Sequence, residues 1–219
     1  KMWSDKVTSE LKEVYSCPRL SPQKREMLRT TLSYIRQVEK SYEFQQCLYD
    51  EKEKTVKTHG VPSKEALTYG STSFSLWKDV LELPSVRAVL ETREGKKGPK
   101  VAILGSSQGL LCLYTDALCN SFVENSDERV CISGWEIIPC LHEIADDIMR
   151  NVSTELSHIQ VHLQDMLRAD LSDFDVVVLT SLCWDSHTRL KIAKKLSQDL
   201  RRGSLVLDYR EDTFSQFGL

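Results

Sequence analysis

The sequence of 219 residues lacks several patterns that would narrow its function at once. Its seven cysteines include no Cys-x-x-Cys pair, and we expect buried, reduced thiols in an intracellular protein. No apolar run approaches the roughly 18 residues that a membrane-spanning helix needs. No signal peptide is recognisable either, so we expect no membrane partner. An excess of one charge is also missing, because 29 basic and 32 acidic side chains leave a net charge of −3. That balance demands no nucleic-acid partner, although a local basic patch stays open.

The composition that is present is that of an ordinary globular protein. Hydrophobic residues make up 41% of the chain and charged residues 28%. A chain of this length can bury a sizeable core and is most simply one α/β domain with an appendage. It begins at Lys1 rather than at a methionine, and we expect it to be a piece of a longer protein.

Residues 1–66 are predicted to form a helical N-terminal region followed by a linker. Ser21 is suited to cap a helix, and Pro22 suits the first helical position, where its missing N–H costs nothing. Apolar residues then recur at three- and four-residue steps as far as Tyr42, which predicts one amphipathic helix. An earlier helix is expected over residues 3–15.

A change of pattern along the chain predicts a second domain over residues 67–219. The charged stretch 49–66 is interrupted by glycine and proline and is predicted to be a solvated loop or linker. From residue 100 onward, short apolar strands alternate with amphipathic helices, which predicts a parallel sheet with helices on both faces. The strands are expected at 100–104, 129–133, 158–163, 174–180 and 204–208, and the helices at about 108–121, 138–151 and 187–201.

A glycine-containing turn follows the first predicted strand, in the stretch VAILGSSQGLL. Gly105 and Gly109 would let the backbone approach a ligand at the carboxyl edge of the sheet. Their spacing is not that of a dinucleotide fingerprint, so a plain tight turn is the alternative. Glu136 follows the second strand, where a carboxylate can accept hydrogen bonds from both hydroxyls of a ribose. An acid placed at a helix N-terminus is the alternative for Glu136.

Polar side chains also follow the third and fourth predicted strands. Asp165 is suited to accept from an exocyclic amine, with Met166 as an apolar wall for an adenine. Thr180, Ser181 and Trp184 follow the fourth strand and would lie above the sheet, near a transferred group. Because four strand ends converge on one edge, these residues together indicate a cofactor site more strongly than any one of them.

Other candidate sites have simpler interpretations. His158 and His162 lie in a strand-like segment, too far apart for easy joint ligation, and are predicted to be solvated. No metal site is predicted. The basic stretch 93–100 is most simply a solvated loop, with contact to nucleic acid or an acidic partner as the alternative.

The glycine turn, the acid after strand two and the acid after strand three resemble the outline of class I S-adenosylmethionine-dependent methyltransferases. A Rossmann-like sheet is the fold that this resemblance implies. The upstream stretch TYGSTSFSLWKDVL, residues 68–81, is similar to the cofactor-covering loop of the disruptor-of-telomeric-silencing family. These non-SET methyltransferases modify a lysine in the globular core of histone H3. The resemblance covers roughly residues 20–210.

The resemblance implies a protein-lysine methyltransferase that binds S-adenosylmethionine and acts on histone or nucleosome, with nuclear localisation (cytoplasmic as the alternative). If the chain serves instead as a scaffold, other protein partners would bind the N-terminal helices. Thr72, Thr180, Ser181 and Trp184 would take catalytic positions. The cofactor would be bound by Tyr69, Gly70, Thr72, Gly105, Ser107, Gly109, Glu136, Asp165 and Met166.

The sequence departs from the family pattern at several positions. Ile103 stands where the family has an acid, Ser107 where it has its middle glycine, and Ser71 where it has the glutamate of the loop. Thr180 and Ser181 replace an asparagine pair, and the antiparallel strand pair that completes such sheets is not found in the sequence. These departures favour a catalytically weak scaffold as one alternative. A small-molecule or RNA methyltransferase is another, although TSLCWD lacks the Asn/Asp-Pro-Pro-aromatic motif of base-amine enzymes.

Overall fold

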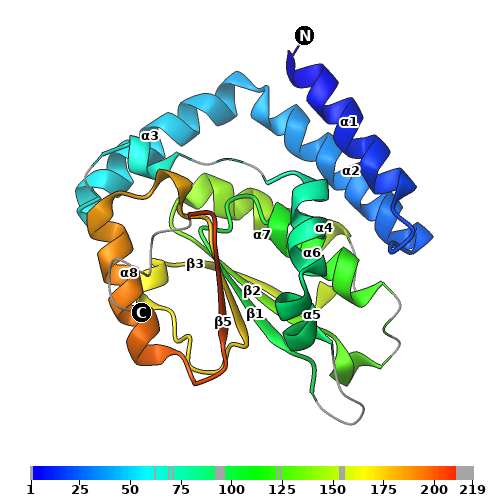
Figure 1. The fold of residues 1–219 in the computed structure, drawn as a ribbon. Coiled ribbons are helices and arrows are strands. Elements are labelled where there is room, and N and C mark those ends of the chain that lie inside the picture. The colour runs from blue at the N-terminus through cyan, green and yellow to red at the C-terminus, as the bar shows by residue number, and fades with distance from the viewer. Residues whose placement is uncertain are drawn as a thin grey trace.

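A computed structural model describes residues 2–61, 63–68, 70, 72–91, 97–121, 123, 125–152 and 156–210. Helices and strands alternate through most of the chain (Figure 1). The α-helices are α1 (Met2–Ser16), α2 (Pro22–Glu39), α3 (Tyr42–His59), α4 (Phe74–Glu82), α5 (Pro84–Leu90), α6 (Leu110–Asn120), α7 (Pro139–Val152) and α8 (Ser186–Asp199). The strands are β1 (Lys100–Leu104), β2 (Cys131–Glu136), β3 (Ile159–Leu163), β4 (Val176–Leu179) and β5 (Leu205–Asp208). Short 3-10 turns lie at η1 (Glu65–Leu67), η2 (Ser126–Glu128), η4 (Met166–Arg168) and η5 (Ser181–Cys183).

The five strands form one parallel sheet in the order β3-β2-β1-β4-β5. The order reverses beside β1, so the crevice at the carboxyl ends of β1 and β4 is the topological switch point. This arrangement is a Rossmann-like sheet. The predicted fold class is confirmed, and each predicted strand is found within two residues of its expected ends except β2, which runs on to Glu136.

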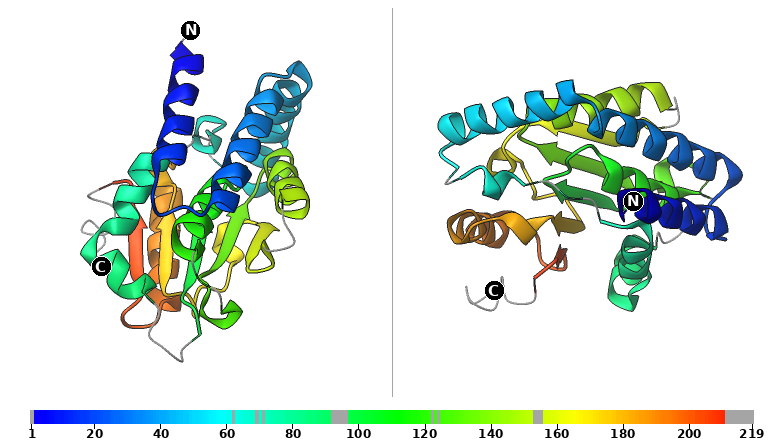
Figure 2. Two further views of the ribbon diagram at one scale, coloured as in Figure 1. Left: turned by 90° about the vertical axis from the view of Figure 1, so that its right-hand side faces the viewer. Right: turned by 90° about the horizontal axis from the view of Figure 1, so that it is seen from above.

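The two faces of the sheet are covered by different helices because strand residues alternate between them. On one face Val101 and Ile103 of β1 pack with residues of α2, α4, α6 and α7. On the other face Ala102 and Leu104 pack with Ile192 of α8. The view from above in Figure 2 shows α2 and α3 along one side of the sheet and α8 on the opposite side.

The second helix begins as predicted and ends earlier. The Ser21 side chain accepts a hydrogen bond from the Lys24 N–H, and Pro22 takes the first helical position. The helix stops at Glu39, and Ser41 caps a new helix that starts at Tyr42. Tyr42 is 75% exposed, so its predicted place on the apolar stripe is wrong.

The predicted loop over residues 49–66 is largely helical. Helix α3 continues to His59 and ends at Gly60, whose φ of 63° is the left-handed conformation that commonly closes a helix. Its buried side chains are few (Phe44, Leu48 and Thr55), and most of the other residues of the helix are polar or charged. A narrow apolar stripe among many charges explains why its sequence resembles a solvated loop.

The N-terminal helices share one hydrophobic core with the sheet. Buried residues of α1 and α2 belong to the same cluster as Ile103 and Ile132. Helices α2 and α3 both pack against α7, and Figure 1 shows the three N-terminal helices passing over one end of the sheet. The domain boundary at residue 66 stays a prediction. Among the helices in the described part of the chain, none has the length and apolarity to cross a membrane.

The seven cysteines are free, as expected, but they are not all buried. Cys17, Cys112 and Cys140 are buried, whereas Cys131 and Cys183 are exposed. The remaining two, Cys47 and Cys119, are half-buried.

A buried charge network lies beneath α2. Asp116 of α6 is fully buried and accepts from the Lys24 ammonium at 2.5 Å. Its other oxygen lies 2.6 Å from His158 Nε2 and 3.2 Å from Asn120 Nδ2. His158 is therefore not solvated as predicted, because its ring is committed to a buried carboxylate. The network ties α2 and the start of β3 to the same side chain of α6.

This network gives the protein an acid-dependent stability. Burial by itself would raise the pKa of Asp116, but the hydrogen bond from His158 and the charge of Lys24 hold that pKa below its usual 3.8. A lowered native pKa stabilises the fold above the unfolded value and loses that contribution as the pH falls through the native value. Urea unfolding between pH 2 and pH 6 should therefore show the wild type losing more stability on acidification than Asp116→Asn. Parallel curves for the two proteins would contradict this.

Candidate functional site

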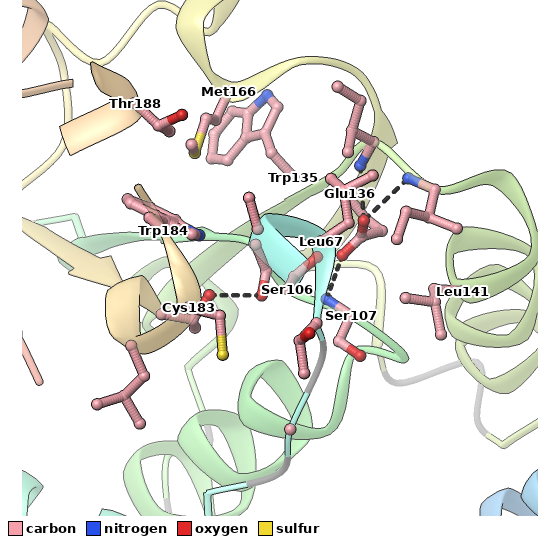
Figure 3. Close-up of a pocket in the computed structure, with 18 of the residues that line it drawn as sticks. Leu67, Ser106, Ser107, Trp135, Glu136, Leu141, Met166, Cys183, Trp184 and Thr188 are labelled. Atoms are coloured by element: carbon pink, nitrogen blue, oxygen red, sulfur yellow. Dashed lines mark hydrogen bonds between the residues drawn. The ribbon is translucent and has the colours of Figure 1, made fainter. Parts of the chain in front are cut away.

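A cavity of about 640 Å³ opens at the carboxyl edge of the sheet. This volume lies within the range of about 300–1,000 Å³ that is typical of small-molecule and cofactor sites. Its wall is formed by the ends of β1 and β2, by the segments after β3, β4 and β5, and by described residues between η1 and α4. Figure 3 shows side chains of these segments facing one space. The cavity therefore lies where open α/β sheets bind their ligands.

The glycine turn after β1 forms one wall and is fixed to β2. The N–H groups of Gly105 and Ser106 both donate to the Trp135 carbonyl, at 2.9 and 2.8 Å. Gly105 has a φ of 79°, and a Cβ atom there would lie 2.4 Å from Thr180 Oγ1. Ser107 also has a positive φ, 52°, which is uncommon for a residue with a side chain. The turn is thus a tightly held, strained segment at the cavity wall.

Replacing Gly105 by alanine is expected to cost more stability than the same change at Gly203. Both glycines have positive φ, which costs a residue with a Cβ about 1–2 kcal/mol. Only Gly105 adds a close contact, because Thr180 Oγ1 is held by the carbonyls of Leu104 and Gly105, whereas Gly203 has open space. Overpacking should add about 1–3 kcal/mol in urea unfolding of Gly105→Ala. Equal losses for the two variants would show that Thr180 simply moves aside.

Glu136 is the last residue of β2 and is held entirely by backbone N–H groups. Its Oε1 accepts from Ile137 and Ile138, at 2.8 and 2.9 Å, and its Oε2 accepts from Ser107 at 2.9 Å (Figure 3). The residue is only 8% exposed. Burial raises the pKa of Glu136, and the three N–H donors counter part of that rise.

These contacts combine the two roles that were open for Glu136. The carboxylate satisfies N–H groups immediately before α7, as an acid at a helix N-terminus does, and it also joins β2 to the glycine turn. A carboxylate offers about four acceptor positions, of which three are occupied here. Glu136 therefore keeps one acceptor position free in this arrangement, and its contact with both hydroxyls of a ribose stays a prediction.

Asp165 and Met166 lie together on the cavity wall, as predicted. Asp165 also caps η4, because its Oδ1 accepts from the Leu167 N–H at 2.9 Å.

Trp135 is a lining residue that the sequence did not predict. Its indole stacks on the His162 ring with 5.0 Å between centroids, so the half-buried His162 is covered on one face and only partly solvated. The only signal in the sequence was an aromatic residue next to the acid at a strand end.

The residues after β4 divide between the cavity and the core. Thr180 and Trp184 line the cavity. Ser181 is fully buried, its hydroxyl bonds to Asp208, and it is not part of the cavity wall, so its predicted place facing a reacting amine is wrong. Thr180 Oγ1 donates to backbone carbonyls, which leaves it only as an acceptor toward a ligand. Asp185 caps α8 through the N–H groups of His187 and Thr188 and is no free base.

The segment ahead of α4 closes another side of the cavity. Gly70 and Thr72 line it, as predicted, and the Thr72 hydroxyl bonds to that of Tyr209, which follows β5. Tyr69 and Ser71 lie outside the described residues.

Gly109, in contrast, is not part of the cavity wall. It precedes α6 with a φ of 78°, and a Cβ there would come within 3.2 Å of the Ala145 Cβ atom. Its predicted contact with a cofactor is therefore replaced by close packing of α6 on α7.

Comparisons with known proteins give only distant likenesses. The sequence matches no protein-family model and no curated protein. Among solved structures, an RNA methyltransferase from Salinibacter ruber in complex with S-adenosyl-L-homocysteine is 20% identical, with a TM-score of 0.47 over 64% of this chain and 76% of its own. Aeropyrum pernix fibrillarin with natively bound S-adenosyl-L-methionine is 17% identical, with a TM-score of 0.41 over 62% of this chain and 51% of its own. TrmN from Thermus thermophilus is 15% identical, with a TM-score of 0.45 over 69% of this chain and 43% of its own. The fold is assigned from the strand order and register of this chain.

Proposed function

We propose that this protein binds S-adenosylmethionine in the cavity and transfers its methyl group to an acceptor. The observation that carries the proposal is the strained turn at Gly105–Ser107 bound to Glu136 at the switch point of a Rossmann-like sheet, beside a cofactor-sized cavity. A turn that only reversed the chain would not need a buried carboxylate and two positive-φ residues at a cavity wall.

The lining residues fit the chemistry of such a cofactor. The backbone of Ser106 lines the cavity, while its Oγ is buried against Gly134 and has no hydrogen-bond partner among the described residues. Glu136 retains one acceptor position for a ribose hydroxyl. Asp165 offers its second oxygen for an adenine amine, and Met166 with Trp135 offers apolar and aromatic surface for the adenine ring.

The chain's own contribution to the reaction is positioning and the exclusion of water. When bound, the cofactor supplies an activated methyl group on a sulfonium, which an acceptor displaces in line. Thr72 and Trp184 would hold the acceptor against that side of the cavity. His187 lines the cavity, is exposed and stands on the first turn of α8, where its ring can take the proton that the acceptor releases.

Lysines at the edge of the cavity favour an anionic acceptor, and we propose RNA. Lys191 lines the cavity, and the carboxylates of Glu136 and Asp165, which also line it, are engaged by backbone N–H groups. Lys194 lies on the same face of α8, because 187, 191 and 194 are spaced by four and three residues. A cationic rim attracts phosphate and repels a lysine-rich histone segment. The missing Asn/Asp-Pro-Pro-aromatic motif argues against a base amine as the acceptor atom.

A histone lysine is the second candidate, supported by the resemblance of residues 68–81 to the loop of the disruptor-of-telomeric-silencing family. Nuclear localisation and a nucleosome partner belong to this candidate.

Protein partners on the N-terminal helices are a separate proposal. Four tyrosines support it, because they are exposed on α1, α2 and α3: Tyr15, Tyr34, Tyr42 and Tyr49.

Transfer of a radiolabelled methyl group to RNA, nucleosomes and free histones separates the two candidates. We expect label in RNA, and we expect Lys194→Glu to reduce that labelling while leaving cofactor affinity unchanged. Label in histone H3 alone would favour the second candidate. Cofactor binding without transfer to any acceptor would support a catalytically weak scaffold.

A further inference from the structure

Two helices that are remote in the sequence bring thiols and carboxylates together beside the cavity. Within the described chain, Cys47, Glu51 and Cys140 are the one group of three cysteine, histidine or acidic residues whose ligand atoms lie close enough to share a metal ion. One ligand atom from each lies within 4.8 Å of the others. Cys47 and Glu51 are four residues apart on α3, so they share one face of that helix. Cys140 is the second residue of α7, which packs against α3.

A candidate fourth ligand, outside this close group of three, lies one turn further along α7. Glu143 lies three residues after Cys140, on the same side of the helix, and is exposed. Each helix thus presents one thiol and one carboxylate, in the spacings Cys-x-x-x-Glu and Cys-x-x-Glu.

We propose that Cys47, Glu51, Cys140 and Glu143 form a four-ligand site for Zn²⁺ that joins α3 to α7. Thiolates and carboxylates are both zinc ligands, and a tetrahedron with Zn–S bonds of about 2.3 Å places two sulfur atoms about 3.8 Å apart. The ligand atoms of Cys47, Glu51 and Cys140 already lie within 4.8 Å of one another, and the Glu143 side chain would turn toward them to complete the tetrahedron. Both thiols lose their protons to solvent on binding, so the bound ion faces two thiolates and two carboxylates.

The position of Cys140 favours this chemistry. Its N–H donates to Glu51 Oε2 at 2.6 Å, which holds the carboxylate at the start of α7. Four protein ligands leave no open coordination position, which is typical of a structural zinc site. Since α7 starts three residues after Glu136, the ion would brace the segment that carries the Glu136 contacts.

Zinc competition with a chromophoric chelator, under reducing conditions, tests this proposal. We expect one Zn²⁺ per chain, and we expect Cys47→Ser and Cys140→Ser each to lower the affinity by more than about 100-fold, since even the loss of an outer-shell partner costs 10–100-fold. Glu51→Gln keeps an acceptor for the Cys140 N–H and should still lower the affinity. Cys131→Ser, at an exposed thiol of β2, is the matched control and should leave binding unchanged.

Co²⁺ provides a spectroscopic readout of the ligand set, beside the affinity. The wild-type protein should show a thiolate-to-cobalt charge-transfer band and the absorption of a tetrahedral ion, and Glu143→Gln should weaken the tetrahedral signal. Failure to bind Zn²⁺ would overturn the proposal, as would equal binding by Cys47→Ser. A Cys47–Cys140 disulfide that forms in air, with no metal bound after reduction, would also overturn it. None of these outcomes bears on cofactor binding.

Discussion

Replacing Glu136 by alanine is expected to lower the free energy of unfolding by about 2–4 kcal/mol and to abolish cofactor binding. The change leaves the N–H groups of Ser107, Ile137 and Ile138 without their acceptor. Each unsatisfied buried donor costs about 1–3 kcal/mol, and water in the cavity relieves part of that cost. The glycine turn would also lose its link to the end of β2. Urea unfolding and calorimetric titration measure the two effects.

Glu136→Gln separates the support of the turn from simple loss of a side chain. The amide oxygen of glutamine can still accept from the N–H groups of Ile137 and Ile138. Its NH₂ group would face the Ser107 N–H, and because both groups are donors, no hydrogen bond can form there. We therefore expect a smaller loss of stability than in Glu136→Ala. Glu91→Ala serves as the matched control, because Glu91 is an exposed carboxylate paired with Arg87 and should change stability by less than about 0.5 kcal/mol. Full stability in Glu136→Ala would mean that its three contacts do not support the turn.

Replacing Asp116 by alanine is expected to destabilise the protein by about 3–5 kcal/mol, the usual cost of removing one partner from a buried ion pair. The Lys24 side chain is 11% exposed, and its ammonium would be left largely buried without its carboxylate. His158 and Asn120 would each lose a bond to the same side chain. Thermal and urea unfolding measure the loss.

Two further variants show whether burial of the charges causes this loss. Asp146→Ala removes an acid of a solvent-facing pair with Arg150 and should cost less than about 0.5 kcal/mol. The double variant Lys24→Met/Asp116→Leu removes both charges and should recover much of the stability, since buried ion pairs can be replaced by apolar residues at little cost. A double variant as unstable as Asp116→Ala would show that the side-chain hydrogen bonds matter more than the charges.

The sheet could be predicted from the sequence because its strands are short apolar runs with clear boundaries. KVAIL and FDVVVLT, for example, are bounded by polar residues and turns, and both are strands in the structure. Helix α3 could not be predicted, since only Phe44, Leu48 and Thr55 of its 18 residues are buried. Tertiary packing against α7, rather than a strong apolar stripe, accounts for its position.

The candidate site was predictable in its location and less so in its contacts. The convergence of strand ends correctly placed Gly105, Glu136 and Asp165 around one cavity. The partners of Glu136 and the burial of Ser181 depend on backbone N–H directions and on Asp208, which no sequence pattern encodes. In the buried network, Asp116 is separated in the sequence by 92 residues from Lys24 and by 42 from His158, so no local spacing of residues could reveal these contacts.

Calorimetric titration of the chain with S-adenosylmethionine and S-adenosylhomocysteine tests the central claim most directly. We predict a saturable heat corresponding to one ligand per chain for both compounds, and its loss in Glu136→Ala. Absence of saturable heat up to about 1 mM of either compound, where binding is worth only about 4 kcal/mol, would contradict a cofactor site in this cavity.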